Sequence, residues 1–360
     1  MNASPPSKVL IAGGKPAGGV ASFAEALRCG FTELGIPAEV AEPTKILRRP
    51  GELRDPNVLK ILSLAAVFGA PIARRAICVA HGFPCAQHQG WPTTLAVLAS
   101  LRLATASKGT QLVVVSAYSA VHLNSIFGLR VDAVIHNPVH PIFLEPVPPA
   151  ECNREAITYV GRLHSAKHVD RLLPAMRDVL DENPGLRAWI IGDGPMRAEL
   201  ETIAAGDQRI EFLGTLSPVQ VRDRLRCTRV FISGCLTEAL GITYLEALSQ
   251  GCAVAMPATG GGLEIAPELI GTRIQLFPNS LTREGIGAAI RGALGATAEF
   301  RGRSNYYPAV VAQGYLAIDE RFSAEGRFNP TTARDEAATE SDFKADARCS
   351  IDGRGTHERA

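Results

Sequence analysis

Two glutamates eight residues apart, Glu238 and Glu246, are the residues of this 360-residue chain whose types and spacing most directly indicate chemistry. Glu238 stands among loop-forming residues just ahead of Gly241, and Glu246 falls in an apolar run that predicts the first turns of a helix. A carboxylate buried in such a run is costly to ionise unless a partner hydrogen-bonds or neutralises it. The pair favours a polyhydroxylated, phosphorylated ligand, and the alternative is a helix cap followed by a surface glutamate.

Two cations follow directly on a predicted strand. The apolar run Ala156–Val160 precedes Arg162 and Lys167. Because strand ends in a parallel sheet open into the ligand crevice, the two side chains could converge there. Opposite a diphosphate, each charge-assisted contact would contribute roughly 1.5–3 kcal/mol. The alternative is a pair of solvated surface cations.

A run of three glycines comes shortly after the strand pattern Ala253–Met256. Free backbone N–H groups in such a turn could hold phosphate oxygens or sugar hydroxyls, and a plain flexible loop is the alternative. The run and the acid that follows it are Gly260, Gly261, Gly262 and Glu264.

Signals in the N-terminal half are weaker. His81 ends the strand pattern Ala76–Ala80, so it would face the crevice, unless it is a structural histidine bonded to backbone. Gly18 and Gly19 precede a helical pattern, but they do not fit the dinucleotide-binding motif with an acid about 20 residues on.

The sequence favours diphosphate binding without a metal. His164 and His168 are spaced like helical metal ligands, but no third ligand is suggested nearby. The chain has no Asp-x-Asp, which argues against a divalent ion bridging a nucleotide diphosphate. The negative charge of the diphosphate would instead be neutralised by Arg162, Lys167 and the dipole of the helix starting near Gly241.

The elements that position these residues alternate between strand and helix, which predicts an α/β protein of two doubly wound, Rossmann-like domains facing across a cleft. Residues 137–151 hold five of the 24 prolines and indicate a linker. We expect an acceptor-side domain over 1–150, a donor domain over 151–300, and over 301–360 a return helix at Val310–Phe322 followed by a disordered polar tail. One segment of the first domain, Asn57–Phe68, is predicted to be a helix.

Composition sets limits on function and location. The net charge of +1, with 20% charged residues, gives no general case for nucleic-acid binding. The eight cysteines form no CxxC pair, which favours a reduced, cytoplasmic compartment. The N-terminus lacks the regions of a signal peptide, and the most apolar stretch, Ile61–Ala73, is too short to span a bilayer. Contact with the inner membrane surface stays open.

Taken together, these segments resemble the retaining, nucleotide-sugar-dependent glycosyltransferases of the GT-B fold known as family 4, or glycosyl transferases group 1. The resemblance covers residues 156–270. Four segments carry it in order: Val160-Gly-Arg-Leu with Lys167, Ile191-Gly-Asp-Gly-Pro195, the pair Glu238 and Glu246, and Gly260-Gly-Gly-Leu-Glu264.

The resemblance implies roles for the side chains. Arg162 and Lys167 would hold the donor diphosphate and stabilise the departing nucleotide. Glu246 would bind the ribose hydroxyls, Glu238 would contact the transferred sugar, and His81 would approach that sugar from the acceptor side. The leaving phosphate would accept the acceptor's proton, so no protein base is needed.

Further substrate contacts are implied for Glu264 and for glycines of both halves. Gly18 and Gly19 would lie near acceptor and phosphate, and the run at 260–262, with Gly241, near the donor. The partners implied are a nucleotide-diphosphate sugar and a glycan or lipid-linked acceptor, without nucleic acid, metal or further cofactor.

The chain departs from the family pattern at three places. Asn137-Pro-Val-His140 stands where Asn-Gly-Val-Asp is usual, and Glu238-Ala-Leu-Gly241 replaces Glu-Gly-Phe-Gly. The helix that normally crosses back onto the first domain is expected after Glu320-Arg-Phe-Ser323, where the sequence is polar, so Val310–Phe322 is the alternative position.

Two other functions remain open on sequence grounds. A catalytically silent nucleotide-sugar-binding scaffold would keep the fold, although it could lose Arg162, Lys167, Glu238 or Glu246 freely. A sugar-nucleotide epimerase or a phosphorylase would share the two-domain fold, but no lysine-centred cofactor site is evident.

Overall fold

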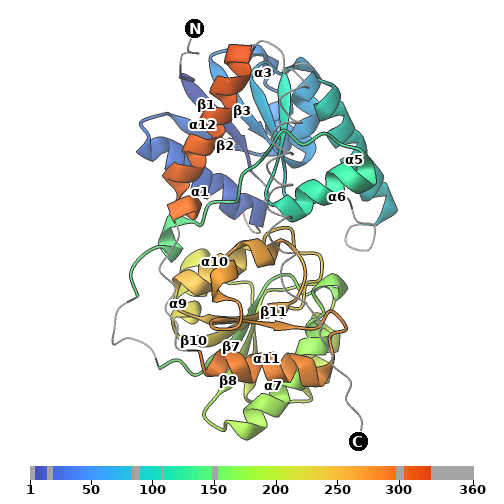
Figure 1. Ribbon diagram of the computed structural model, residues 1–360, viewed down its shortest axis with the longest axis vertical. Helices are drawn as coiled ribbons and strands as arrows, with labels where there is room; N and C mark the ends of the chain where they lie inside the picture. Colours follow the sequence, from blue (N-terminus) through green and yellow to red (C-terminus); the bar gives the residue numbers. More distant parts are fainter. Residues whose placement is uncertain are drawn as a thin grey trace, which may run out of the picture.

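Two parallel β-sheets, each of six strands and each flanked by helices, form the two halves of the molecule (Figure 1). The predicted α/β architecture of two doubly wound domains is therefore confirmed. The computed structural model describes residues 5–13, 19–82, 84, 90–107, 109–147, 153–296 and 304–325.

The N-terminal sheet has the strand order β2-β1-β3-β4-β5-β6 and is parallel throughout. Its central strands are buried along their whole length, because helices cover both faces and short apolar runs are the sequences that fill such a sheet. The strands are β1 Lys8–Ala12, β2 Ala38–Ala41, β3 Val58–Leu62, β4 Ala76–Ala80, β5 Thr110–Val114 and β6 Ala133–Val134.

Helices of the N-terminal domain connect these strands. Among them α5 and the 3₁₀ helix η1 pack against each other and lie next to the carboxyl end of β4. The helical segments are α1 Gly19–Glu33, α2 Pro43–Leu47, α3 Pro50–Arg54, η1 Leu64–Ile72, α5 Trp91–Ala106, α6 Ala117–Phe127 and, after the last strand, η2 Pro141–Phe143.

The predicted helix over Asn57–Phe68 is wrong. Strand β3 occupies Val58–Leu62 between β1 and β4, and η1 follows it. A short apolar run has no period that separates a buried strand from a buried helix, and the pairing partners on both sides decide. Even Lys60 is fully buried there, with its ammonium donating to the carbonyl of Arg74 at 2.5 Å.

The C-terminal sheet has the order β12-β11-β10-β7-β8-β9. Sequence patterns predicted most of these elements, but β12 and α11 were not anticipated. The strands are β7 Ala156–Val160, β8 Arg187–Ile191, β9 Ile210–Gly214, β10 Thr228–Ile232, β11 Ala253–Pro257 and β12 Ile274–Phe277. The helices are η3 Ser165–Lys167, α7 Val169–Glu182, α8 Arg197–Ala204, α9 Pro218–Arg226, α10 Ile242–Ser249, η4 Gly261–Glu264, η5 Pro267–Leu269 and α11 Arg283–Leu294.

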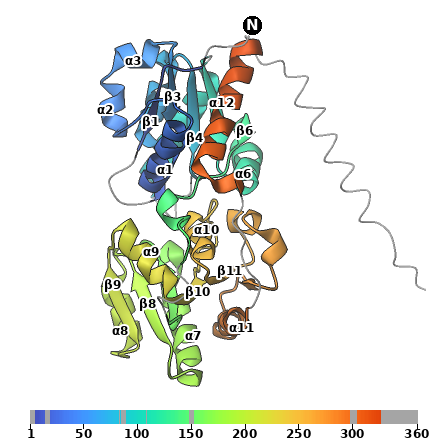
Figure 2. The same cartoon turned by 90° about the vertical axis from the view of Figure 1, so that its left-hand side faces the viewer.

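The chain then returns to the N-terminal domain. After η6 Ser304–Tyr306, helix α12 spans Pro308–Glu325, over the segment where the sequence predicted a helix. Both ribbon views place α12 beside α1 (Figures 1 and 2). A side chain at Gly30 of α1 would lie 2.1 Å from the carbonyl of Pro308, and Asp319 accepts hydrogen bonds from Arg75 at 2.7 to 3.0 Å. The tail predicted beyond this helix lies outside the described residues.

Cysteine chemistry and membrane-spanning potential can be stated for the described part of the chain. Cys29, Cys78, Cys235 and Cys252 are free thiols. Cys227 is disulfide-bonded, so the expectation that the cysteines are reduced is wrong at this position. In the described ranges, no helix combines the length and the apolar character needed to cross a bilayer.

Candidate functional site

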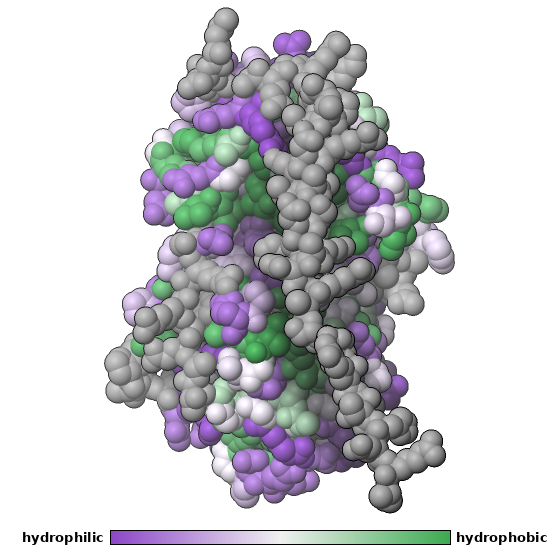
Figure 3. Space-filling view, viewed as in Figure 1, coloured by the Kyte–Doolittle hydropathy of each residue, from purple (hydrophilic) through white to green (hydrophobic). Residues whose placement is uncertain are grey.

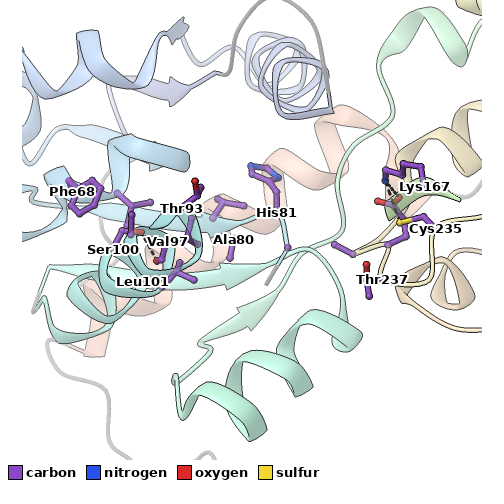
Figure 4. A pocket seen from close by; sticks show the side chains of 16 residues that line it. Phe68, Ala80, His81, Thr93, Val97, Ser100, Leu101, Lys167, Cys235 and Thr237 are labelled. Carbon is purple, nitrogen blue, oxygen red and sulfur yellow. Dashed lines mark hydrogen bonds and ion pairs between the residues drawn. The ribbon is translucent and has the colours of Figure 1, made fainter. Parts of the chain in front are cut away.

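A cavity of about 540 Å³ lies between the two domains. Its N-terminal wall consists of residues from η1, from the end of β4 and from α5, and its C-terminal wall consists of Lys167 and the loop that follows β10. Figure 4 shows His81 between these two groups, with the side chains of α5 on one side and Lys167, Cys235 and Thr237 on the other. The cavity is therefore the place where both domains can act on one ligand.

The C-terminal wall carries an ion pair. The Lys167 ammonium lies 2.7 Å from Oε2 of Glu238 and also donates to Sγ of Cys235 at 3.4 Å. Burial disfavours the ammonium, but the neighbouring carboxylate outweighs it and raises the pKa of Lys167. Lys167 thus stays positively charged beside an acid at the cavity surface, whereas the sequence predicted that it would converge there with Arg162, which does not line the cavity.

A glycine allows Glu238 to reach this position. Gly241 is the N-cap of α10 and has φ +80°, which favours glycine. A Cβ there would lie 2.5 Å from the Tyr244 ring and 3.1 Å from Cγ of Glu238. The loop can fold this tightly over the start of α10 only without a side chain at 241.

The glycine run after β11 packs directly on the same loop. The N–H of Gly261 donates to the carbonyl of Glu238 at 2.9 Å, and a Cβ on Gly261 would lie 1.8 Å from the carbonyl oxygen of Ala239. Gly260 has φ +87°, and a Cβ on Gly262 would lie 2.6 Å from the Tyr244 ring. The run therefore positions the Glu238 loop, and the N–H of Gly261 is already used within the protein.

Glu246 is a buried acid within α10. It is 6% exposed, and burial raises the pKa of its carboxyl to about 8. It does not line the cavity shared with His81 and Lys167. The costly burial that the sequence predicted is present, and the surface-glutamate alternative is wrong.

Arg162 lies apart from the Lys167–Glu238 pair. Its side chain is exposed at the turn after β7 and is not part of the cavity wall. The turn itself is rigid: the Tyr159 hydroxyl donates to the Arg162 carbonyl at 3.0 Å, and a Cβ on Gly192 would lie 1.9 Å from the carbonyl oxygen of Gly161. The Gly192–Pro195 turn is thus a packing partner of the turn that carries Arg162.

His81 lies at the carboxyl end of β4 and forms part of the cavity wall. Burial lowers the pKa of its imidazole to about 4, and the neighbouring Asn137 opposes this shift, so the ring is neutral at pH 7. Its ring packs edge-on against Phe23 at 4.5 Å. Nε2 of His81 and Oδ1 of Asn137 are both buried without a hydrogen-bond partner among the described residues. Such atoms favour a ligand hydroxyl at this point.

Glu264 contacts the N-terminal domain. Its carboxylate accepts hydrogen bonds from the N–H groups of Ala117 and Tyr118, at 2.8 and 2.7 Å, and so caps helix α6. It also lies 3.5 Å from Nε2 of His136. Burial raises the pKa of Glu264, but His136 and the two amides outweigh it and lower it overall. A substrate contact of Glu264 stays a prediction, and the observed contact joins the two domains.

The remaining candidate residues have local roles. Gly19 is the first residue of α1, and Gly18 lies outside the described residues. The side chain of His164 accepts from the N–H of Ala166, and His168 has φ +52° at the start of α7. Within the described ranges, no three His, Cys, Asp or Glu side chains are grouped so as to hold a metal ion.

Sequence reasoning missed several residues of the cavity. Cys235 and Thr237 precede Glu238 in the loop, and their nearness to a predicted site residue was the available signal. Asn137, which neighbours His81 but is not part of the cavity wall, follows β6 at the carboxyl edge of the sheet, where strand-end logic could have marked it. The apolar residues of η1 and α5 carry no pattern that separates a cavity wall from a core.

Comparison with known proteins bears on both halves. Residues 154–293 match the protein family described as glycosyl transferases group 1. Over 124 residues the chain is 32% identical to the phosphatidylinositol N-acetylglucosaminyltransferase gpi3 subunit of Schizosaccharomyces pombe, a match that covers 33% of this chain and 27% of that protein. A second relative is the GDP-mannose-dependent monoacylated alpha-(1-6)-phosphatidylinositol monomannoside mannosyltransferase of Corynebacterium glutamicum. The two sequences are 28% identical over 170 residues, and the match covers 41% of this chain and 43% of that protein.

The fold is similar to that of Anabaena HepE in complex with UDP and glucose, with a TM-score of 0.62, 18% identity, and 94% of this chain and 100% of that chain covered. The sequence matches thus span less than half the length of these two relatives, whereas the structural match spans both domains. Residues 154–293 are thus similar to the glycosyl transferases group 1 family, and the chain has the GT-B fold of two facing Rossmann-like domains.

Proposed function

We propose that this protein moves a sugar from a nucleotide-diphosphate sugar to a glycan or lipid-linked acceptor, in the synthesis of a polysaccharide or glycolipid. The observation that carries the proposal is the Lys167–Glu238 pair on the wall of the interdomain cavity, 2.7 Å apart, within the segment that is similar to the family. A charged cation and an acid at one point can bind the leaving group and the sugar of one donor.

In this proposal the cations act on the leaving group. Negative charge develops on the diphosphate as its bond to the sugar breaks, and a preorganised cation stabilises that charge. Lys167 is held in its charged form at the cavity, which supports this role. Arg162, exposed at the strand end, would contact the diphosphate when the donor is bound. Only contacts that strengthen toward the transition state raise the rate.

The acids bind hydroxyl groups in this proposal. Glu238 would contact the transferred sugar, with the Gly260–Gly262 run holding its loop in place. Glu246 would bind the ribose hydroxyls of the nucleotide, which would supply the hydrogen bonds that stabilise a buried carboxylate. The raised pKa of Glu246, about 8, supports a site that is completed by a ligand.

The reaction is proposed to retain anomeric configuration and to need no metal. The leaving phosphate would accept the proton of the acceptor hydroxyl, and the neutral His81 would accept or donate a hydrogen bond at that hydroxyl. The unpartnered Nε2 of His81 supports this contact. Neutralisation by Lys167 and Arg162 would replace a bridging cation.

We also infer a cytoplasmic protein that contacts the inner membrane surface with its N-terminal domain. Exposed apolar side chains gather on α5, including Trp91 and Leu95. Figure 3 shows apolar, green residues on the edge of that domain where Figure 1 draws α5 and α6. The names of both relatives include phosphatidylinositol, which favours a lipid-linked acceptor.

The test is release of free nucleoside diphosphate from a panel of nucleotide sugars, with and without acceptor. We expect release from one donor, lost in Glu238→Ala and Arg162→Ala. The matched control is Arg171→Ala: this exposed cation lies four residues after Lys167 and pairs only locally, 3.4 Å from Asp170.

The alternatives give different results. Binding of a donor without turnover, for every acceptor tried, would identify a scaffold. Interconversion of sugars without nucleotide release would identify an epimerase. Equal losses in Arg171→Ala and Arg162→Ala would remove the specific role given to the strand-end cation.

A further inference from the structure

The N-terminal wall of the cavity is mostly apolar, with Thr93 and Ser100 as its hydroxyl side chains. Val67 and Phe68 of η1, Val79 at the end of β4, and Val97 and Leu101 of α5 line it. The hydroxyl of Ser100 already donates within the helix to the carbonyl of Val97 at 2.7 Å. The charged side chains of the lining lie at the opposite wall, where Lys167 and Glu238 pair.

Helix α5 extends this apolar wall to the protein surface. It spans Trp91–Ala106 with Arg102 as its charged residue, and it exposes Trp91 (71%) and Leu95 (59%). Phe68 is 47% exposed and also lines the cavity, so the cavity wall is continuous with the exposed apolar surface.

This distribution of polarity discriminates between acceptor classes. A free oligosaccharide carries hydroxyls on every residue, and each one that leaves water needs a hydrogen-bond partner. The hydroxyl side chains of the η1–α5 part of the lining are those of Thr93 and Ser100, and the hydroxyl of Ser100 is already bonded within the helix, so this wall offers few such partners. A hydrocarbon chain needs none and gains affinity from each methylene that leaves water.

The polar end of the cavity suits the other part of such a molecule. The buried Nε2 of His81 has no partner among the described residues, and it lies between the apolar wall and the Lys167–Glu238 pair (Figure 4). A hydroxyl at this point would satisfy His81 and stand beside the wall that is proposed to hold the donor.

We propose that the acceptor is an amphiphile whose hydrocarbon chain occupies the space between η1 and α5 and whose hydroxyl lies at His81. The inference rests on the proposed transfer reaction and specifies its acceptor. In that reaction the bond between the anomeric carbon and the diphosphate oxygen breaks, and the acceptor oxygen bonds to that carbon. The acceptor's proton passes to the departing diphosphate, so no other reactant is needed.

The first experiment uses the unaltered protein and a series of alkyl glycosides below their micelle concentrations, from methyl to octyl. Binding is followed by calorimetry, and transfer by nucleotide release. Each buried methylene strengthens binding by about fourfold, so the octyl compound is expected to bind at least tenfold more tightly than the butyl compound. Equal affinity across the series would overturn the proposal.

The second experiment alters the wall. The variants are Val97→Gln, within the cavity, and Phe68→Gln, at its mouth. In each, the ratio of octyl to butyl glycoside affinity is expected to fall by tenfold or more. The matched control is Val121→Gln on α6, which is 59% exposed and does not line the cavity. An equal loss in the control would assign the effect to the general surface instead.

Failure of this inference can be told from failure of the proposed function. Chain-length-dependent binding without nucleotide release from any donor would leave the apolar site standing and remove the transfer reaction. Transfer to free oligosaccharides, with no gain from an alkyl chain, would support the reaction and overturn the amphiphilic acceptor.

Discussion

The two walls of the interdomain cavity are built on opposite principles. The C-terminal wall is an ion pair on a tightly packed backbone, in which Gly241 and Gly261 leave no room for a side chain. The N-terminal wall is made mostly of apolar side chains on η1 and α5. Bond breaking at a donor needs charges in fixed places, whereas a hydrocarbon chain needs only apolar volume. Under the proposed function, the charged wall would act on the donor and the apolar wall would select the acceptor.

The largest expected effect concerns the helix that crosses between the halves. Asp319 of α12 is 4% exposed and pairs with Arg75. Asp319→Ala removes the carboxylate that pairs with the largely buried guanidinium of Arg75, and breaking a buried ion pair costs about 3–5 kcal/mol of stability. Unfolding in urea and hydrogen exchange along α1 are expected to show this loss in the N-terminal domain. The environment of Trp189 in β8 should report little change in the C-terminal domain at low urea.

The control for this prediction is Glu320→Ala, because Glu320 is exposed on the same helix. Similar losses in both variants would show that helix propensity, and not the ion pair, holds α12. Simultaneous unfolding of both domains in Asp319→Ala would show that the two halves are one cooperative unit.

The next effect tests the charged wall alone. Lys167→Met removes the cation beside Glu238 and is expected to lower turnover by about 100–1000-fold, the loss found when one preorganised electrostatic contact is removed. Binding of an octyl glycoside should be kept, because the apolar wall is untouched. Steady-state kinetics and calorimetry on one preparation, with Arg171→Ala as control, measure both. Loss of octyl glycoside binding in Lys167→Met would contradict the proposal that the two walls bind their ligands independently.

The same contrast explains how far the sequence could predict the molecule. Lys167 and Glu238 could be placed because each follows a strand and because glycines mark where the backbone approaches itself closely. The apolar wall could not be predicted, since Val97 and Leu101 look like core residues until the packing of α5 is known. The strand at Val58–Leu62 was mistaken for a helix for a similar reason: pairing with β1 and β4, and not the local pattern, defines it.

Long-range contacts were equally invisible. Glu264 was predicted from its place after the glycine run, but nothing near it in sequence indicates that it caps α6 in the other domain. The pairing of Asp319 with Arg75 joins residues 244 positions apart. Such contacts depend on how the two domains and α12 are arranged, which a single sequence does not encode locally.

A smaller effect concerns the buried acid of the C-terminal domain. The carboxyl of Glu246 has a pKa of about 8 in the folded protein against an ordinary value of 4.5, because burial disfavours its charge. Between these values the unfolded chain releases a proton that the folded chain keeps, so stability falls as pH rises. The slope is up to about 1.4 kcal/mol per pH unit. In Glu246→Gln this slope should disappear from urea unfolding measured between pH 5 and pH 8.

Glu199→Gln is the control, because Glu199 is exposed on α8. It should leave the pH dependence unchanged. Glu246→Gln is also expected to weaken nucleoside diphosphate binding while it stabilises the protein at pH 8. A variant that gains stability and keeps full nucleotide affinity would remove Glu246 from the donor site and assign it to the core.

The smallest effect tests how the two walls are kept together. Glu264 belongs to the C-terminal domain but caps α6 of the N-terminal domain, and a capping contact of this kind contributes about 0.5–2 kcal/mol. Its pKa is lowered, so the contribution is present above pH 4.5 and is lost as pH falls through the lowered value.

Glu264→Gln should increase amide exchange at Ala117 and Tyr118 and widen the spread of domain separations in X-ray scattering. Glu284→Gln, at the first turn of α11 within one domain, should do neither. If scattering and exchange are unchanged, the walls are held by α12 and the linker alone. If both change while nucleotide binding and alkyl glycoside binding are each kept, the contact of Glu264 sets the distance between the two walls without shaping either of them.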